Sequence, residues 1–255
     1  MTPSPVPPGS PESTDQSRDP ARPSGPAAAV LPPALRSRLA DYAQKVAALC
    51  GDRLESLCLF GAALTPDWCP GRPIHQVMVF TRDDLDLIGR LGALGPGAVT
   101  LGLAAPLLVT ATLIRTSLDT FPLEWLEITN SHAVLLGHDP FQDLSFAREH
   151  VRLQCERECA VLCISLRQRL LRGPASINQP LVDLAEHALR VLGGMLYLKH
   201  QRCPGAPSAV IADSQRLLAL DLTPIMRAWQ GETGRDLLIA IHRLLSGLEE
   251  RCDHA

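Results

Sequence analysis

The fold of this chain depends on residues 54–80, which read LESLCLFGAALTPDWCPGRPIHQVMVF. Residues 54–60 form a compact apolar run that ends at Gly61, and this pattern predicts a buried strand that runs into a turn. A loop rich in Pro and Gly follows over residues 65–73, and residues 74–80 (IHQVMVF) predict a second strand. Two apolar strands joined by a long loop are therefore the expected centre of a sheet.

Helices and further strands are expected around this centre, from helical spacing, N-cap residues and short alternating runs. The predicted helices cover residues 34–50, 83–94 and 110–118, and the predicted strands cover residues 123–129 (LEWLEIT) and 132–136. Residues 91–114 carry no formal charge and are long enough to span a membrane. Pro96 between two glycines breaks a helix there, so buried strands and turns are expected instead.

The pattern becomes helical after residue 142. Amphipathic stretches bounded by Gly, Pro and Thr predict helices over residues 144–172, 181–200, 223–229 and 234–252. Residues 1–33 contain ten of the 22 prolines and are expected to be disordered. The expected fold class is thus α+β, with a mixed sheet and flanking helices over residues 34–142 and an all-α helical bundle over residues 143–255.

The order of these elements resembles the nucleotidyltransferase superfamily, and its minimal and kanamycin-type members in particular. Members carry an apolar strand that ends in Gly-Gly or Gly-Ser, a following strand with Asp-x-Asp, and a third carboxylate on a further strand. LCLFGA (57–62) with Ala63-Leu64-Thr65 is similar to the first element, and FPLEWLEI (121–128) and GHDP (137–140) are also family-like. The resemblance covers most of residues 50–170. It implies a vestigial nucleotide-binding site at Gly61, Ala62, Thr65, His75 and Glu127.

The chain departs from the family at the positions that would hold the metal. Two carboxylates at i and i+2 on a strand project to one face, where they can share the Mg²⁺ that bridges nucleotide phosphates. The corresponding pair here is Pro73 and His75, or Ile74 and Gln76 if the alignment shifts by one residue. Only Glu127 corresponds to the third acid. Mg²⁺ prefers oxygen ligands, so the resemblance implies a scaffold with a degenerate metal site.

Asp84-Leu85-Asp86 offers an alternative pair of acids in the same region. Leu85, Ile88 and Leu91 continue it as a helix, on which positions i and i+2 point about 200° apart. An Asp-rich first turn is the ordinary way to begin a helix. The alternative function is therefore an active Mg²⁺-dependent nucleotidyltransferase that uses Glu127 with Asp84 or Asp86 as unorthodox ligands.

Two other groups of polar residues have competing interpretations. Cys155, Cys159 and Cys163 recur at helical spacing within an apolar stripe, which favours core packing over a Cys-based metal site. The arginines of residues 148–172 are interleaved with Glu, which favours i,i+4 surface pairing over an anion-binding groove. His187, on the predicted helix 181–200, is expected at a solvated or boundary position.

Composition and charge exclude several function classes. The net charge is −3, with 24 basic against 27 acidic residues, which gives no strong nucleic-acid signal. The N-terminus has neither a basic segment nor the apolar run of a signal peptide. A cytoplasmic location, reduced cysteines and no membrane contact are therefore expected.

The expected function is that of a pseudoenzyme, a catalytically inactive nucleotidyltransferase-like protein that acts as a binding or partner module. No catalytic residue, metal or cofactor is expected, and Mg²⁺ enters only with the active alternative. Three partners stay open: a nucleotide bound with residual affinity, a protein partner, and a second copy of the chain.

Overall fold

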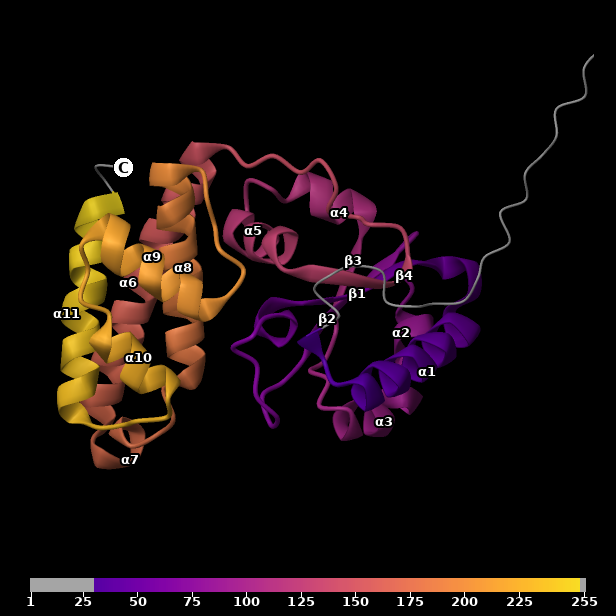
Figure 1. The fold of residues 1–255 in the computed structure, drawn as a ribbon, viewed down its shortest axis with the longest axis horizontal. Helices are drawn as coiled ribbons and strands as arrows, with labels where there is room; N and C mark the ends of the chain where they lie inside the picture. Colours follow the sequence, from indigo (N-terminus) through magenta and orange to yellow (C-terminus); the bar gives the residue numbers. More distant parts are fainter. Residues whose placement is uncertain (1–29, 253–255) are drawn as a thin grey trace, which may run out of the picture.

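A computed structural model describes residues 30–252, which form a four-stranded mixed sheet with helices on its faces and a group of helices beside it (Figure 1). The α+β class expected from the sequence is confirmed. Residues 1–33 are predicted to be disordered, and residues 1–29 of this segment lie outside the described residues. Among residues 30–252, no helix is both long enough and apolar enough to cross a membrane.

The sheet has the strand order β3-β2-β1-β4. Its strands are β1 (Leu54–Phe60), β2 (His75–Phe80), β3 (Leu107–Thr110) and β4 (His132–Gly137). β1 is antiparallel to β2 and β4, and β3 is parallel to β2. The strands predicted over residues 54–60, 74–80 and 132–136 are confirmed. Because Phe60 pairs with His75, the turn at Gly61 and the start of β2 lie at the same end of the sheet.

Side chains alternate between the two faces of the sheet, and helices cover both faces. Leu57 and Met78 belong to a core that the sheet shares with three helices of the first half. These helices are α1 (Pro33–Cys50), α2 (Leu85–Leu91) and α3 (Gly95–Thr100). Cys58 and Val77, on the opposite face, belong to a second core with later helices. β1 and β2 are thus buried on both sides, which explains why they read as nearly continuous apolar runs.

The prediction of a strand over residues 123–129 is wrong, because this segment is the helix α5 (Pro122–Asn130). Pro122 lies in the first helical turn, where its missing N–H removes no hydrogen bond. Apolar side chains are buried on most sides of α5, so its sequence resembled the alternation of a strand. The remaining face carries Glu124 and Glu127, which are three residues apart and therefore neighbours.

The prediction for residues 91–114 is wrong in part. Pro96 does not exclude a helix there, because it lies in the first turn of α3 and begins that helix.

Short 3₁₀ turns join other elements of the fold. They are η2 (Gly51–Arg53), η3 (Gly61–Leu64) and η4 (Gly92–Leu94). The helix predicted over residues 110–118 is α4 (Ala111–Thr116), and the Thr110 hydroxyl caps it by accepting a 3.1 Å hydrogen bond from the Leu113 N–H.

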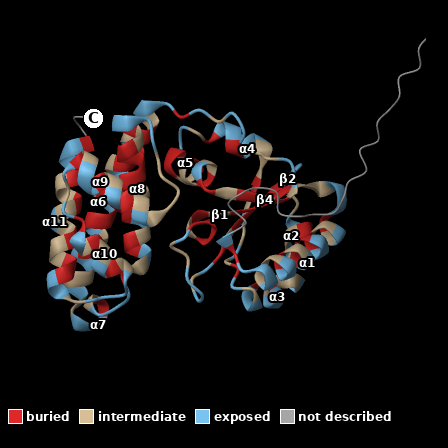
Figure 2. Ribbon diagram, in the orientation of Figure 1, coloured by how far each residue is buried: buried red, intermediate tan, exposed pale blue. Residues whose placement is uncertain are grey.

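The second half of the chain is helical, as predicted. Its helices are α6 (Arg148–Arg172), α7 (Pro174–Ile177), α8 (Val182–His200), α9 (Pro207–Leu218), α10 (Thr223–Trp229) and α11 (Arg235–Cys252). The sequence did not predict α7 or α9, and α6 begins four residues later than expected. Buried residues lie in the strands, in α5 and in these helices (Figure 2). α5 packs against α6 and α8, so one hydrophobic core joins the sheet to these helices. Because the two halves share a core, the predicted division into domains of residues 34–142 and 143–255 stays a prediction.

Two glycines allow backbone segments to approach closely. At Gly137, which has φ +78°, a Cβ would overlap the backbone carbonyl oxygen of Glu55. At Gly194, in α8, a Cβ would overlap Leu123 Cδ2 and lie 2.7 Å from Cys155 Sγ. The first glycine lets β4 end against β1, and the second lets α8 pack closely on α5 and α6.

The cysteine stripe of α6 packs in the core. Cys155, Cys159 and Cys163 are all buried, so the packing interpretation is confirmed. A hydrogen bond with Cys252 of α11 and burial raise the pKa of the Cys159 thiol. In the part of the chain that the structure describes, no group of three or more His, Cys, Asp or Glu is arranged to hold a metal ion. The geometry therefore gives no support to a Cys-based metal site.

Candidate functional site

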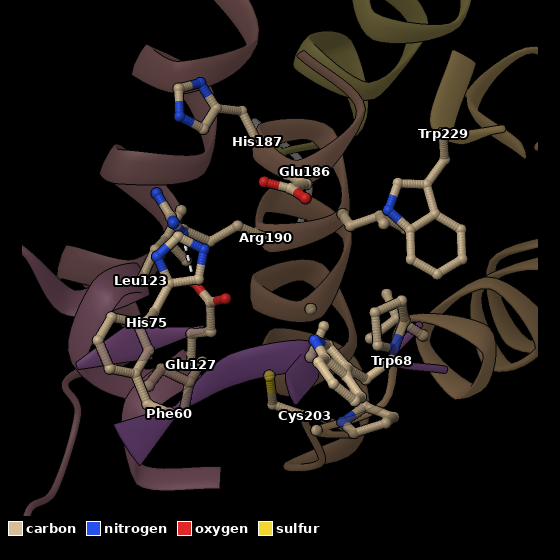
Figure 3. Close-up of a pocket in the computed structure, with 18 of the residues that line it drawn as sticks. Phe60, Trp68, His75, Leu123, Glu127, Glu186, His187, Arg190, Cys203 and Trp229 are labelled. Atoms are coloured by element: carbon tan, nitrogen blue, oxygen red, sulfur yellow. Dashed lines mark hydrogen bonds and ion pairs between the residues drawn. The ribbon is translucent and has the colours of Figure 1, made fainter. Parts of the chain in front are cut away.

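A pocket of about 280 Å³ lies where the Gly61 end of the sheet meets α5 and α8 (Figure 3). The sheet contributes Phe60 and His75, the turn η3 contributes Ala62, and α5 contributes Glu127. α8 supplies a polar stripe, and the loop before β2 and the end of α10 supply aromatic and basic side chains. These further lining residues are Trp68, Arg72, Asp183, Glu186, His187, Arg190 and Trp229.

The structure brings together most of the residues that the resemblance singled out. A Cβ placed on Gly61 would lie 3.9 Å from both Glu127 Oε1 and His75 Cδ2, so these three residues meet at one point. Ala62 lines the same pocket. Thr65 does not line it, because this buried residue donates a 2.8 Å hydrogen bond to the Ala62 carbonyl and supports the turn.

The turn at Gly61 is fixed by backbone contacts with the end of α5. Gly61 has φ +81°, a left-handed conformation that favours glycine. Its N–H donates a 2.8 Å hydrogen bond to the Ser131 carbonyl, and the Ser131 hydroxyl donates at 3.2 Å to the Gly61 carbonyl. These two bonds hold the end of β1 against the helix that carries Glu127.

Glu127 forms an ion pair with Arg190 of α8. Arg190 Nε donates to Glu127 Oε2 at 2.6 Å (Figure 3). Arg190 Nη1 lies 3.5 Å from Glu124 Oε1. Burial alone would lower the pKa of Arg190, but the charge of Glu127 and its hydrogen bond outweigh burial and raise that pKa. The Arg190 guanidinium is therefore a permanent cation against the one acid that the resemblance retains.

Glu124 and Gln154 extend this network to α6. The Gln154 amide donates a 2.7 Å hydrogen bond to Glu124 Oε2, and its oxygen accepts one of 2.7 Å from the Leu123 N–H. The two α5 carboxylates are thus held by side chains of α6 and α8. We conclude that the position of Glu127 is set by the surrounding helices.

A second cationic side chain, Arg72, closes another wall of the pocket. Its guanidinium carbon lies 4.2 Å from the centroid of the Trp229 ring, and its Nη2 donates to the Trp229 carbonyl at 2.8 Å. Nη1 lies 3.7 Å from Glu186 Oε1. Arg72 belongs to the predicted loop 65–73, so this loop is attached to both α8 and α10.

The structure places the two residue pairs left open by the sequence in different surroundings. Pro73 and His75 both line the pocket, while Ile74 and Gln76 are buried away from it. His75 stacks on Phe60, with 5.5 Å between the ring centroids. The pair that faces the pocket is therefore a proline and a histidine, neither of which carries a carboxylate.

The residues present do not fit a Mg²⁺ site. Neither Pro73 nor His75 offers the oxygen that Mg²⁺ prefers, and Glu127 is already paired with Arg190. Asp84 caps α2 by accepting a 2.9 Å hydrogen bond from the Leu87 N–H, and it pairs with Arg53. β1 and β2 are antiparallel, so Asp84 lies at the opposite end of this strand pair from Glu127, about 20 Å away along the strands.

Several residues of the pocket were not predicted from the sequence. Asp183, Glu186, His187 and Arg190 follow an i, i+3, i+4, i+7 spacing in α8, and this polar stripe was the available signal. His187 is exposed at the pocket's edge, which agrees with the expected boundary position. On α6, Arg152 pairs with Glu149 and Glu156, as the surface-pairing interpretation predicts.

No protein-family model matches the chain, and no curated protein matches it.

Proposed function

We propose that this chain is a nucleotidyltransferase-like scaffold that no longer transfers nucleotides and that uses its pocket as a binding site. The observation that carries this proposal is the ion pair between Glu127 and Arg190. A carboxylate whose Oε2 lies 2.6 Å from a guanidinium has its charge largely neutralised, which weakens it as a metal ligand, and breaking a partly buried ion pair is costly.

The arrangement around this ion pair also supports binding without a metal. The turn at Gly61, the start of β2 and Glu127 meet at one pocket, as the resemblance implies for a nucleotide site. Arg190 supplies positive charge where the family would use Mg²⁺. Any residual nucleotide affinity is therefore expected to be independent of Mg²⁺.

Pyrophosphate release tests the loss of transfer activity. The purified chain is incubated with Mg²⁺, each of the four nucleoside triphosphates, and hydroxyl-bearing acceptors that include kanamycin. We expect no release above that of the matched variant Glu127→Gln. Mg²⁺-dependent release by the wild-type chain that Glu127→Gln abolishes would overturn the proposal and favour an active enzyme with unorthodox ligands.

A calorimetric titration with ATP tests the role of the metal in binding. The proposal expects equal affinity with Mg²⁺ and with EDTA, or no binding in either case. Binding that is at least tenfold tighter with Mg²⁺ would contradict a metal-free pocket.

A further inference from the structure

His132, the first residue of β4, has a hydrogen-bond acceptor at each of its two ring nitrogens. Nδ1 lies 3.0 Å from the Ile128 carbonyl oxygen, near the end of α5, and Nε2 lies 3.1 Å from Asp139 Oδ1. A carbonyl oxygen and an ionised carboxylate only accept hydrogen bonds, and a neutral imidazole carries a single N–H. The ring therefore satisfies both partners only when both nitrogens carry protons.

The surroundings of the ring favour this doubly protonated, positively charged form. Asp139 supplies the opposite charge, and a cation is also favourable near the last carbonyls of a helix. The His132 side chain is 15% exposed, so water reaches the ring but does not surround it. Phe141 holds both partners, because its N–H donates to Asp139 Oδ1 at 2.9 Å and its ring meets the imidazole edge to face, with 5.1 Å between the centroids.

Two further titratable groups lie near this pair. Burial, together with the charge of Asp139, raises the pKa of the Cys58 thiol on β1 to about 12, so this thiol stays uncharged near neutral pH. His138 precedes Asp139 in the chain and is exposed. Within residues 30–252, Asp139 is the only charged group bonded to the His132 ring. A change of charge within the pair near neutral pH must therefore come from the imidazole.

The Ile128 carbonyl connects the ring to the turn at Gly61. This carbonyl also accepts a 3.2 Å hydrogen bond from the Ser131 N–H, and Ser131 forms both of the bonds that fix Gly61. When the ring loses one proton, the remaining N–H stays on the stronger, charged acceptor, Asp139. Nδ1 then presents a lone pair to the Ile128 carbonyl oxygen at 3.0 Å, and two acceptors at this distance repel each other.

We propose that His132 is a pH-sensitive switch for the turn at Gly61 beside the pocket. With both nitrogens protonated, the ring holds the end of α5, and Ser131 with it, against the loop that follows β4. Release of the Nδ1 proton to water breaks the bond to Ile128 and loosens the turn. The inference goes beyond the proposed function and does not depend on it, because no nucleotide, metal or other ligand takes part.

Long-range ¹H–¹⁵N NMR spectra of the full chain show directly which nitrogens of the His132 ring carry protons. A titration from about pH 5 to about pH 8.5, the range in which histidine titrates, follows the ring and the Gly61 amide in the same samples. We expect both ring nitrogens to be protonated at the acidic end. The Gly61 amide signal should then change with the same midpoint as the ring.

Hydrogen exchange measures how far the turn loosens. After correction for the intrinsic effect of pH on exchange, protection of the Gly61 amide should fall about fivefold across the transition, the effect of one hydrogen bond. The amide of Val77, in the interior strand β2, is the internal control. Its protection should not follow the transition, because its ladder bonds lie away from the switch.

His132→Gln and His138→Gln are a matched pair of variants. Glutamine in place of His132 keeps a donor for Asp139 but cannot titrate, so the pH-dependent change at Gly61 should disappear. His138→Gln removes an exposed ring beside Asp139 and should leave that change as it is. Asp139→Asn keeps an acceptor for the Phe141 N–H but removes the charge that favours the imidazolium, so the ring and Gly61 transitions should move to lower pH together.

Three results would overturn the switch. They are a His132 ring with a single proton at the acidic end of the titration, a Gly61 midpoint that differs from that of the ring, and an unchanged Gly61 transition in His132→Gln. If His132→Gln does not fold, the comparison of the two midpoints in the wild type still decides. Mg²⁺-dependent pyrophosphate release would overturn the proposed function alone.

Discussion

Arg190 on α8 donates to Glu127 on α5 across a distance of 2.6 Å. The two residues are 63 positions apart in the sequence, and the pair links α5, which lies between β3 and β4 in the chain, to the helical second half. Its position beside Gly61 and His75 makes it the central feature of the pocket. The pair therefore has two roles, since it stabilises the packing of α5 on α8 and neutralises the retained acid.

Removal of the Arg190 charge should destabilise the protein. Arg190→Gln leaves Glu127 and Glu124 without their cation, and we expect a loss of about 1–3 kcal/mol in the free energy of unfolding. Urea denaturation measures this loss, and a double-mutant cycle with Glu127→Gln isolates the coupling of the pair. Arg227→Gln is the matched control, because the pair of Arg227 with Glu232 is about half exposed and should contribute less than about 0.5 kcal/mol. Equal losses in the two variants would contradict the structural role of Arg190.

Gly137 should be the glycine least tolerant of substitution. Gly137→Ala places a Cβ on the Glu55 carbonyl oxygen at a residue with positive φ, and we expect a loss of about 3 kcal/mol or failure to fold. Thermal and urea denaturation measure the loss.

Gly247→Ala is the control for Gly137→Ala. A Cβ at Gly247 would meet no atom within 4 Å, and this residue lies within α11. The substitution should stabilise the helix by roughly 0.5–1 kcal/mol. A Gly137→Ala variant as stable as the wild type would show that β4 does not end against Glu55 as described.

The Asp84 carboxylate should make stability depend on pH in the acidic range. The hydrogen bond from the Leu87 N–H, together with Arg53, lowers the pKa of Asp84 from its ordinary value of 3.8. A group whose pKa is lower in the folded state stabilises the protein fully above its unfolded pKa, and this contribution disappears as the pH falls through the folded value. Asp84 should therefore stabilise the fold at neutral pH and contribute nothing in strong acid.

Asp84→Asn tests this pH dependence, because Asn is also a good N-cap and only the charge is lost. The urea midpoint of the wild type should exceed that of Asp84→Asn at neutral pH, and the two midpoints should converge below the folded pKa. Asp86→Asn, which removes an exposed charge from the same helix, is the control. A difference between wild type and Asp84→Asn that grows in acid would contradict the assigned role.

Thiol reactivity should distinguish Cys69 from the other seven cysteines. Cys69 is exposed, whereas burial raises the pKa of Cys58 and of Cys203 to about 12. Because the thiolate is the reactive form, Ellman's reagent should modify one thiol rapidly in the native protein at neutral pH. Cys69→Ser should abolish that fast phase, and several fast thiols in the wild type would contradict the buried core of α6.

The two central strands of the sheet, β1 and β2, were predictable from the sequence because of how they are buried. β1 and β2 are covered on both faces, so their sequences are nearly continuous apolar runs with clear ends at Gly61 and Phe80. α5 was not predictable in the same way, because a short helix buried on most sides lacks the polar face that marks helical periodicity. The error mattered for the site, since a helix places Glu124 beside Glu127 and a strand does not.

The pocket was only half predictable from the sequence. The family resemblance singled out Gly61, His75 and Glu127, which the sheet and α5 bring together. Arg190 and Trp229 reach the same pocket from the second half of the chain, and no local pattern states which face of a helix meets a distant sheet. The polar stripe of α8 is visible in the sequence, but only the packing of α8 on α5 shows that this stripe faces the pocket.

Binding of Mn²⁺, measured by electron paramagnetic resonance as the free-ion signal during a titration, tests the central claim most directly. The claim is that the ion pair with Arg190 prevents Glu127 from acting as a metal ligand. We predict that the wild type and Glu127→Gln give the same titration curve, both without nucleotide and with ATP. A Mn²⁺ site in the wild type that Glu127→Gln abolishes would contradict the claim.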